Sequence, residues 1–546
     1  MKADLILYNG LIHTMSDTHP QAQAVALYGG RIVAVGSDAE VKTLAGRGTQ
    51  FLDLAGRTVV PGFTDSHVHF LWYAVGLTRP NLDGAKSLEE ALARLAPAIA
   101  ATPPGEWVLG FGWNHEEWPL PVFPTRQHLD AIAPAHPVAL RRKDGHSAWV
   151  NSLALKLAGI TSETPDPPGG QINREASGEP TGILRENAMD VLYRLVPEVG
   201  PETFLRALPV GIAQANAAGL TGIHDMEGPE ALLAFQTLHR QGQLTLRVRL
   251  QIPAENLEHA LALGVQSGLG DDVLRLGGVK MFADGSLGSQ TAWMLAPFEG
   301  QPENYGLSTT PVDELAAMAR RAAAGGIACV IHAIGDRANR EVLEIYAALR
   351  REGLGAGLRQ RIEHVQLLHP ADLGRLAALG VVASMQPIHA TSDRYMADRH
   401  WGARSRYGYA WRSLLNAGTV LAFGSDCPVE TLDPLQGLYA AVTRQRADEP
   451  DVPAWYPEEC LTAAEALRAY TVGAAYATGD EGRLGRIAPG YLGDLVVLSQ
   501  DILALPPAEL LATKVDYTIF NGQVVYVRES GNQGISNQGT RKPLIP

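Results

Sequence analysis

Short apolar runs separated by turn dipeptides open the chain, and the same pattern returns near its end. The dipeptides Asn9-Gly10, Gly29-Gly30 and Asn521-Gly522 are typical of tight turns in β-hairpins. We therefore expect residues 1–60 and 485–528 to build one small β domain together. The predicted strands are residues 5–8, 23–28, 31–36, 58–60, 495–498, 517–520 and 524–527.

Between these ends, apolar runs that finish on polar residues alternate with helical stretches rich in Ala and Leu. Eight strand–helix alternations are typical of a parallel α/β barrel, so we expect residues 61–484 to form one barrel domain inserted between the two ends. The eight predicted strands are residues 59–69, 220–225, 246–252, 279–284, 328–334, 361–366, 381–386 and 420–426.

Two segments depart from this alternation. The interval at about 70–219, between the first two barrel strands, contains several Trp residues and is predicted to be an insertion that caps the barrel mouth. Residues 529–546 are rich in Gly, Asn, Gln and Ser without periodicity, so we expect a disordered tail there.

The composition is that of an ordinary globular protein, with 46% hydrophobic and 19% charged residues among 546. The formal net charge is −13 and Lys/Arg-rich runs are absent, which disfavours nucleic acid and anionic membranes as partners. The apolar run at the N-terminus is too short for a signal peptide, and no stretch approaches the length of a membrane span. Three cysteines, an odd number, argue against a disulfide framework, so we expect a cytoplasmic protein.

Several predicted barrel strands end in residues that can bind a metal ion. Residues two apart on a strand point to the same face, so His67 and His69 can bind one ion together. In a parallel barrel all the carboxyl strand ends meet at one face, and buried imidazoles and carboxylates are costly unless paired or coordinated. The sequence therefore predicts a site for a pair of divalent ions. Its ligands would be His67, His69, Lys280, His332, His364 and Asp426.

Lys280 lies among apolar neighbours in residues 277–282. A buried ammonium group is costly and its pKa falls, and a neutral amine can add carbon dioxide to form a carbamate. The two carbamate oxygens could then bridge two cations. The alternative is an inward-facing lysine paired with an acid such as Asp284. Beside four His and an Asp, we expect the carbamate.

Longer motifs around these residues carry a resemblance to a known family. As an ordered set they resemble the amidohydrolase superfamily of metal-dependent hydrolases, and within it the branch of YtcJ-like proteins and N-substituted formamide deformylase (amidohydrolase family 3). The resemblance implies a distorted (β/α)8 TIM barrel, with a small β-sandwich built from both chain ends. The motifs are residues 61–69, 143–151, 280–289, 332–338, 361–364 and 424–429.

The resemblance also implies a role for each predicted ligand. Zn²⁺ suits such ligands, and Mn²⁺, Fe²⁺ and Co²⁺ are alternatives that they admit. His67 and His69 would bind the more buried ion, His332 and His364 the second, carboxylated Lys280 would bridge them, and Asp426 would bind the first ion and transfer the proton.

The implied reaction is hydrolysis of a C–N bond by metal-activated hydroxide, with Asp426 as the catalytic residue. The expected substrate is a small amide, such as an N-substituted formamide or an N-acyl compound. Two alternatives stay open. One is a deaminase or cyclic-amide hydrolase on the same scaffold, and the other is a non-catalytic regulatory or binding protein that kept the fold. A homodimer is the default expectation for the assembly.

Four further residues are candidates for substrate contact. His146 would stabilise an oxyanion or orient substrate, or else be a hydrogen-bonded loop residue. Asp336 would contact substrate, cap a helix or form an ion pair. Trp113 would line an apolar pocket or pack inside the insertion. Gln386 ends the seventh barrel strand and would face the barrel mouth. Glu363 should point away from His364 on its strand and support another ligand.

Overall fold

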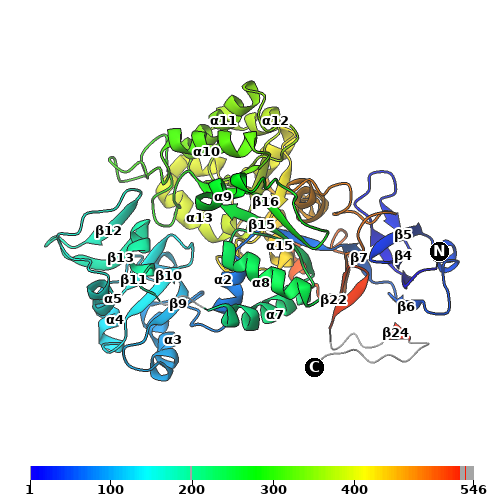
Figure 1. The fold of residues 1–546 in the computed structure, drawn as a ribbon, viewed down its shortest axis with the longest axis horizontal. Coiled ribbons are helices and arrows are strands. Elements are labelled where there is room, and N and C mark those ends of the chain that lie inside the picture. Colours follow the sequence, from blue (N-terminus) through cyan, green and yellow to red (C-terminus); the bar gives the residue numbers. More distant parts are fainter. Residues whose placement is uncertain (1, 197–199, 529–534, 537–546) are drawn as a thin grey trace.

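A barrel of eight parallel strands forms the centre of the molecule (Figure 1). The computed structural model describes residues 2–196, 200–528 and 535–536. Each barrel strand pairs with the next one along the chain, and this confirms the predicted (β/α)8 barrel. The strands are β8 (Phe63–Val68), β14 (Leu220–Asp225), β15 (Arg247–Pro253), β16 (Leu274–Phe282), β17 (Cys329–Ala333), β18 (Arg361–His364), β19 (Val382–Met385) and β20 (Leu421–Phe423).

Backbone hydrogen bonds just beyond β20 bring the last strand back to the first. The Asp426 amide donates to the His67 carbonyl at 2.7 Å, and the His69 amide donates to the Cys427 carbonyl at 2.8 Å. The segment that carries Asp426 is thereby fixed beside the segment that carries the two histidines. The hydrogen bonds that close the barrel therefore also hold Asp426 beside His67 and His69.

Helices cover the barrel, several of them through one apolar face. In α11 (Asp336–Arg351), Ala338, Val342, Ile345 and Leu349 are buried at intervals of three or four residues, which is the spacing of a single helix face. The covering helices include α7 (Pro201–Ala217), α8 (Pro229–Arg240), α9 (Leu257–Ala262), α10 (Val312–Ala324), α11, α12 (Arg375–Leu379), α13 (Pro387–Trp401), α14 (Trp411–Asn416) and α15 (Pro434–Thr443). No helix in the described part of the chain is both long enough and apolar enough to cross a membrane.

Both chain ends contribute to a β-sandwich, as predicted. Its strands β7 (Thr58–Pro61) and β21 (Leu495–Leu498) pair directly, although more than 400 residues separate them in the sequence. Leu7, Val25, Leu495 and Ile519 belong to one buried cluster, which draws on both sheets. The sheet orders are β24-β6-β1-β4-β5 and β23-β22-β21-β7-β2-β3. The remaining strands are β1 (Leu5–Tyr8), β2 (Leu11–His13), β3 (Gln21–Ala22), β4 (Ala24–Tyr28), β5 (Arg31–Gly36), β6 (Gln50–Asp53), β22 (Val515–Phe520), β23 (Gln523–Val527) and β24 (Ile535–Ser536).

Two of the three predicted hairpin turns join paired strands. Gly29-Gly30 connects β4 to β5, and Asn521-Gly522 connects β22 to β23. The hairpin prediction at Asn9-Gly10 is wrong, because β1 lies in one sheet and β2 in the other. The dipeptide does reverse the chain, with Asn9 at a φ of 58°. A turn dipeptide specifies the local reversal, whereas the buried faces of the strands decide which strands pair.

Within the predicted disordered tail, the structure describes only Ile535–Ser536. These two residues form β24 and pair with Phe51 and Leu52 on β6, which differs from the disorder expected for this segment. The backbone of an edge strand such as β6 offers free donors and acceptors to any extended segment. The rest of the predicted tail, residues 529–534 and 537–546, lies outside the described residues.

The insertion forms a sheet of its own on the side of the barrel away from the sandwich (Figure 1). It follows α2 (Phe70–Gly76) and precedes α7, and its strand order is β12-β13-β11-β10-β9. We keep as a proposal the division into a barrel domain at 61–484 and a sandwich at 1–60 with 485–528. The elements of the insertion are α3 (Leu88–Ala101), β9 (Val108–Trp113), α4 (Arg126–Ile132), β10 (Val138–Arg142), β11 (Ser147–Val150), α5 (Ser152–Leu157), β12 (Gly170–Arg174), β13 (Pro180–Glu186) and α6 (Ala188–Tyr193).

Candidate metal centre

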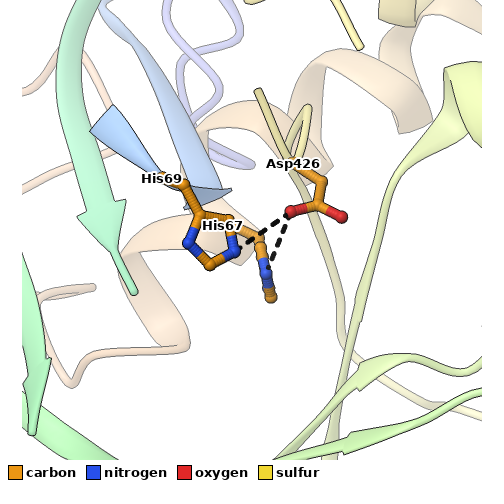
Figure 2. Close-up of side chains that lie close together, drawn as sticks. All are labelled: His67, His69 and Asp426. Carbon is orange, nitrogen blue, oxygen red and sulfur yellow. Dashed lines mark ion pairs between the residues drawn. The ribbon is translucent and has the colours of Figure 1, made fainter. Parts of the chain in front are cut away.

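His67, His69 and Asp426 form the first half of a cluster at the carboxyl end of the barrel. His67 Nε2 lies 3.4 Å from Asp426 Oδ1, and His69 Nε2 lies 3.5 Å from the same oxygen. Figure 2 shows the carboxylate facing both imidazole rings. One ligand atom from each of the three residues lies within 4.8 Å of the others, so a single cation can contact all three.

The other predicted ligands lie directly beside this group. The rings of His364 and His67 have centroids 4.7 Å apart, and those of His364 and His332 are 4.6 Å apart. Lys280 Nζ lies 3.5 Å from His67 Nε2. The structure therefore brings all six predicted residues together, from five different strand ends.

Burial keeps the imidazoles in the neutral form that binds metal ions. It lowers the pKa of His69 to about 3, and it also lowers the pKa values of His67, His332 and His364. Burial lowers the pKa of Lys280 to about 8, so part of its amine is neutral near pH 8. Each of these side chains can therefore offer a lone pair at neutral or mildly alkaline pH.

The carboxylate of the cluster remains ionised. Burial alone would raise the pKa of Asp426, but the neighbouring His67 and a hydrogen bond from His389 hold it well below its usual range. Asp426 and His364 have φ values of 58° and 76°, in the left-handed region that non-glycine residues rarely adopt. Strained backbone of this kind is found where the surrounding structure fixes a functional side chain in place.

Hydrogen bonds fix the orientation of three ligand rings. His67 Nδ1 donates to Glu363 Oε2 at 2.5 Å, as expected from the direction of Glu363 on its strand. His364 Nδ1 donates to Gln386 Oε1 at 2.9 Å. His332 Nε2 lies 2.9 Å from the Gly285 carbonyl oxygen. In each ring the opposite nitrogen is left for a metal ion, which is the usual arrangement of histidine ligands.

Asp284, the alternative partner for Lys280, forms hydrogen bonds with backbone amides instead. Asp284 accepts hydrogen bonds from the amides of Trp293, Ile334 and Gly335 at 2.8, 3.0 and 2.8 Å. Among the described residues, no ion pair joins it to Lys280. The crowding of neutral imidazoles, one amine and one carboxylate in a buried site would be costly without a cation. This donor set therefore fits divalent metal ions.

The sequence reasoning missed His389. It lies in the first turn of α13, with Nε2 3.3 Å from Asp426 Oδ2 and Nδ1 3.5 Å from Glu430 Oε1. Burial lowers its pKa, but the two carboxylates outweigh this and raise it to about 10. The available signal was Pro387, which starts a helix directly after the seventh barrel strand. His389, in that first turn, faces a chamber beside Asp426.

Two of the four candidate substrate residues lie at the site. The His146 ring is 5.3 Å from that of His332, and its Nδ1 lies 2.8 Å from Glu186 Oε2. Burial opposes protonation of His146, but the Glu186 carboxylate raises its pKa to about 9. Gln386 is buried and contacts His364 as described above.

The structure does not bring the other two candidates to the site. Trp113 is fully buried in the core of the insertion, where its indole nitrogen donates to the Leu140 carbonyl at 2.8 Å. Its apolar area serves packing rather than substrate contact. Asp336 lies at the start of α11 and accepts a hydrogen bond from the Leu295 amide at 2.8 Å, so it fixes a loop.

A cleft of about 700 Å³ leads from the cluster to the surface. Trp72, Phe111 and Phe282 give it apolar walls, and His146 and Arg141 from the insertion add polar ones. A chamber of about 50 Å³ lies on the side of Asp426 where His389 and Glu430 stand. The insertion thus supplies part of the wall around the candidate metal centre.

Comparison with known proteins gives one family and several full-length relatives. The model described as "Amidohydrolase family" matches residues 50–526. The chain is 37% identical to Protein LONG AFTER FAR-RED 3 of Arabidopsis thaliana, over 91% of this chain and 87% of that protein. It is 33% identical to YtcJ of Bacillus subtilis, over 96% of this chain and 99% of that one.

Two further matches carry a chemical description. N-substituted formamide deformylase of Arthrobacter pascens is 30% identical over 96% of this chain and 98% of that enzyme. The crystal structure of an uncharacterized metal-dependent hydrolase from Pyrococcus horikoshii OT3 superposes with a TM-score of 0.74 at 28% identity. That match covers 92% of this chain and 99% of the other.

Proposed function

Because this chain belongs to the amidohydrolase family, we propose that it hydrolyses an amide C–N bond with the help of two divalent metal ions. The observation that supports this most directly is the buried cluster of four imidazoles, one lysine and one carboxylate around Asp426. The likeness to N-substituted formamide deformylase and to a metal-dependent hydrolase supports the same chemistry.

Each ligand has a place in the proposed centre. His67, His69 and Asp426 would hold one ion, and His332 and His364 would hold the other. Lys280, as its carbamate, would bridge the two. Zinc suits these ligands best, and Mn²⁺, Fe²⁺ and Co²⁺ are the alternatives that they admit. When bound, such ions supply a water of lowered pKa and polarise the carbonyl of the substrate.

Asp426 is the residue that we propose to move the proton. Its carboxylate is ionised, and its second oxygen faces His389 rather than the ligand imidazoles. It can accept a proton from the attacking water and deliver it to the leaving nitrogen as a general base turned acid. His389 holds the carboxylate in the orientation that this transfer needs.

His146 is placed to stabilise negative charge on the substrate. Its raised pKa keeps it protonated at neutral pH, and it lines the cleft beside His332. A donor aimed at an oxygen that becomes negative during the reaction contributes more in a buried site than in water. The aromatic walls of the cleft would hold an apolar part of the substrate.

An amide panel tests this proposal on metal-loaded protein. It should include N-substituted formamides, N-acyl compounds, cyclic amides and amino-substituted heterocycles, with formate, amine and ammonia measured separately. Release of amine together with formate or another acid supports the amide hydrolase. Release of ammonia from heterocycles would contradict the amide hydrolase and indicate a deaminase. No turnover of any compound, with metal ions bound, would favour a regulatory or binding role.

A further inference from the structure

Two arginine side chains line the cleft beside the metal centre without a charged partner. Arg141 lies on β10 and Arg79 follows α2, and both are half-buried. Among the described residues, neither guanidinium group has a hydrogen bond or an ion pair. A half-buried cation without an acceptor is costly, because water no longer solvates it fully and no protein group replaces the water.

Aromatic rings hold Arg141 in a defined position. Its Cζ lies 4.9 Å from the ring centroid of Trp72 and 4.6 Å from that of Tyr193. The Trp72 ring in turn lies 5.8 Å from the ring of His69, so one indole separates Arg141 from a metal ligand. Stacking of this kind orders a guanidinium but leaves its five N–H donors free to bind an acceptor.

None of the acids that line the same cleft forms an ion pair with these arginines in the described part of the chain. Glu227 accepts a hydrogen bond from the Trp72 amide at 2.7 Å, and burial raises its pKa well above the usual range. Burial raises the pKa of Asp190, and the charges of Arg194 and Arg141 oppose this shift. No ion pair joins its exposed carboxylate to Arg141 among the described residues.

Two further acids are engaged by other bases. Asp144 pairs with Arg142 at 2.7 Å, and Glu186 pairs with His146 at 2.8 Å. Asp426 belongs to the metal centre. Arg141 and Arg79 therefore carry positive charge that no direct ion pair neutralises among the described residues of the cleft.

The two arginines also act on each other. Burial lowers the pKa of Arg79, and the charge of Arg141 contributes to the same shift. Arg141 likewise contributes to the lowered pKa of His69, which places its charge close to the metal ligands. Like charges held together in a half-buried wall destabilise the empty cleft, and a bound anion would relieve them.

We propose that Arg141 and Arg79 form a subsite for a carboxylate of the substrate, so that the amide hydrolysed at the metal centre is an anionic one. This inference rests on the proposed amide hydrolysis. A guanidinium binds a carboxylate through two parallel hydrogen bonds, with a defined orientation. With the carboxylate at Arg141 and the amide at the metals, the substrate would lie along the face of Trp72.

Binding of a matched pair of probes tests the subsite directly. N-benzoylglycine and its neutral carboxamide differ only in the charged group, and calorimetry on the metal-loaded protein gives the affinity of each. We expect the acid to bind at least about tenfold more tightly than the carboxamide, as charge-assisted hydrogen bonds imply. Arg141→Met should abolish this preference.

Arg194→Met is the matched control. Arg194 is exposed at the end of α6 and outside the cleft lining, and its charge acts on Asp190. Its removal changes the net charge equally and leaves Arg141, Arg79 and the aromatic rings beside Arg141 in place. The preference for the acid should survive in this variant. Equal affinity of the native protein for the two probes would overturn the subsite. So would a preference that persists in Arg141→Met, because the carboxylate would then be bound by the metals.

Hydrolysis assays on acid and neutral amides separate the two proposals. An Arg141-dependent preference in binding, with no amide hydrolysed, would refute the proposed function and leave the subsite standing. Hydrolysis of neutral amides as efficiently as their acids, with no binding preference, would refute the subsite and leave the function standing.

Discussion

At the scale of single residues, the site depends on side chains that orient the ligands as much as on the ligands themselves. Glu363 and Gln386 each hold the Nδ1 of one histidine, and His389 holds one oxygen of Asp426. None of these three was assigned as a metal ligand from the sequence. The strand pattern pointed to Glu363 and Gln386 as neighbours of the site, whereas His389, on a helix, was not predicted.

Gln386→Ala should weaken metal binding without unfolding the protein. The substitution removes the acceptor of His364 Nδ1, so the ring loses its fixed orientation. Loss of such a partner costs about 10- to 100-fold in metal affinity or activity. Competition with a chromophoric chelator measures the affinity. Gln241→Ala, at the exposed end of α8, is the control and should bind metal normally. Unchanged metal affinity in Gln386→Ala would contradict this account of the ring.

Lys280→Met should remove the bridging carbamate. Protein loaded with metal in 13C-labelled bicarbonate should show one carbamate carbon resonance, and the variant should lack it. Lys143→Met should retain the resonance, because Lys143 has a raised pKa beside Glu430 and Asp83 despite its burial, and a charged amine does not add carbon dioxide. Two bound ions without any carbamate resonance would show that a different group bridges them.

At the scale of helices and strands, the sequence predicted the repeated strand–helix alternation of the barrel. It missed features that depend on tertiary packing. All eight barrel strands were predicted, because each is an apolar run that ends in a polar residue. His389 was missed because it lies on a helix turn, where no strand pattern points to it. For Trp113 the sequence left open a cleft lining and packing, because composition does not separate the two, and the structure places the ring in the core of the insertion. The pairing of β1 was missed because it depends on distant strands.

Glu465 gives helix α16 (Ala463–Arg468) a pH-dependent stability. It accepts hydrogen bonds from Arg412 at 2.7 and 2.5 Å and from the Thr462 amide at 2.8 Å. The Arg412 hydrogen bonds, with those of Thr462, lower its pKa from 4.5 to about 2. A depressed pKa stabilises the folded state above the unfolded value of 4.5, and this contribution is lost as the pH falls towards 2.

Glu465→Gln should therefore destabilise the protein at pH 7 and much less at pH 2. The Glu465 side chain is 31% exposed and its ion pair with Arg412 lies near the surface, so about 0.5 to 1 kcal/mol is expected at neutral pH. Denaturant unfolding at the two pH values measures the difference. A penalty of equal size at both would show that the charge of Glu465 does not stabilise the helix.

At the scale of the whole molecule, buried ion pairs join the barrel to the sandwich. Arg247 on β15 donates two hydrogen bonds to Asp494, at 2.5 and 2.8 Å, and both side chains are buried. Asp494 directly precedes β21, which pairs with β7 from the other end of the chain. This contact therefore links the first strands, the last strands and the amino end of the barrel.

Asp494→Asn should lower the free energy of unfolding substantially. Removing one partner of a buried pair leaves an uncompensated charge and costs about 3 to 5 kcal/mol. Glu352→Gln is the control, because its pair with Arg320 is exposed and should contribute less than about 1 kcal/mol. Thermal and denaturant unfolding measure both variants. Similar small effects in the two would show that the Arg247 pair does not hold the domains together.

The most direct test of the central claim is the metal content of the purified protein, measured with amide hydrolysis before chelation, after chelation and after metal restoration. The account predicts two divalent ions per chain, activity lost with them and regained when they return. One ion per chain would refute the bridged pair at Lys280. No tightly bound ion, with no activity restored by any divalent metal, would contradict the claim that these six residues form a hydrolytic metal centre.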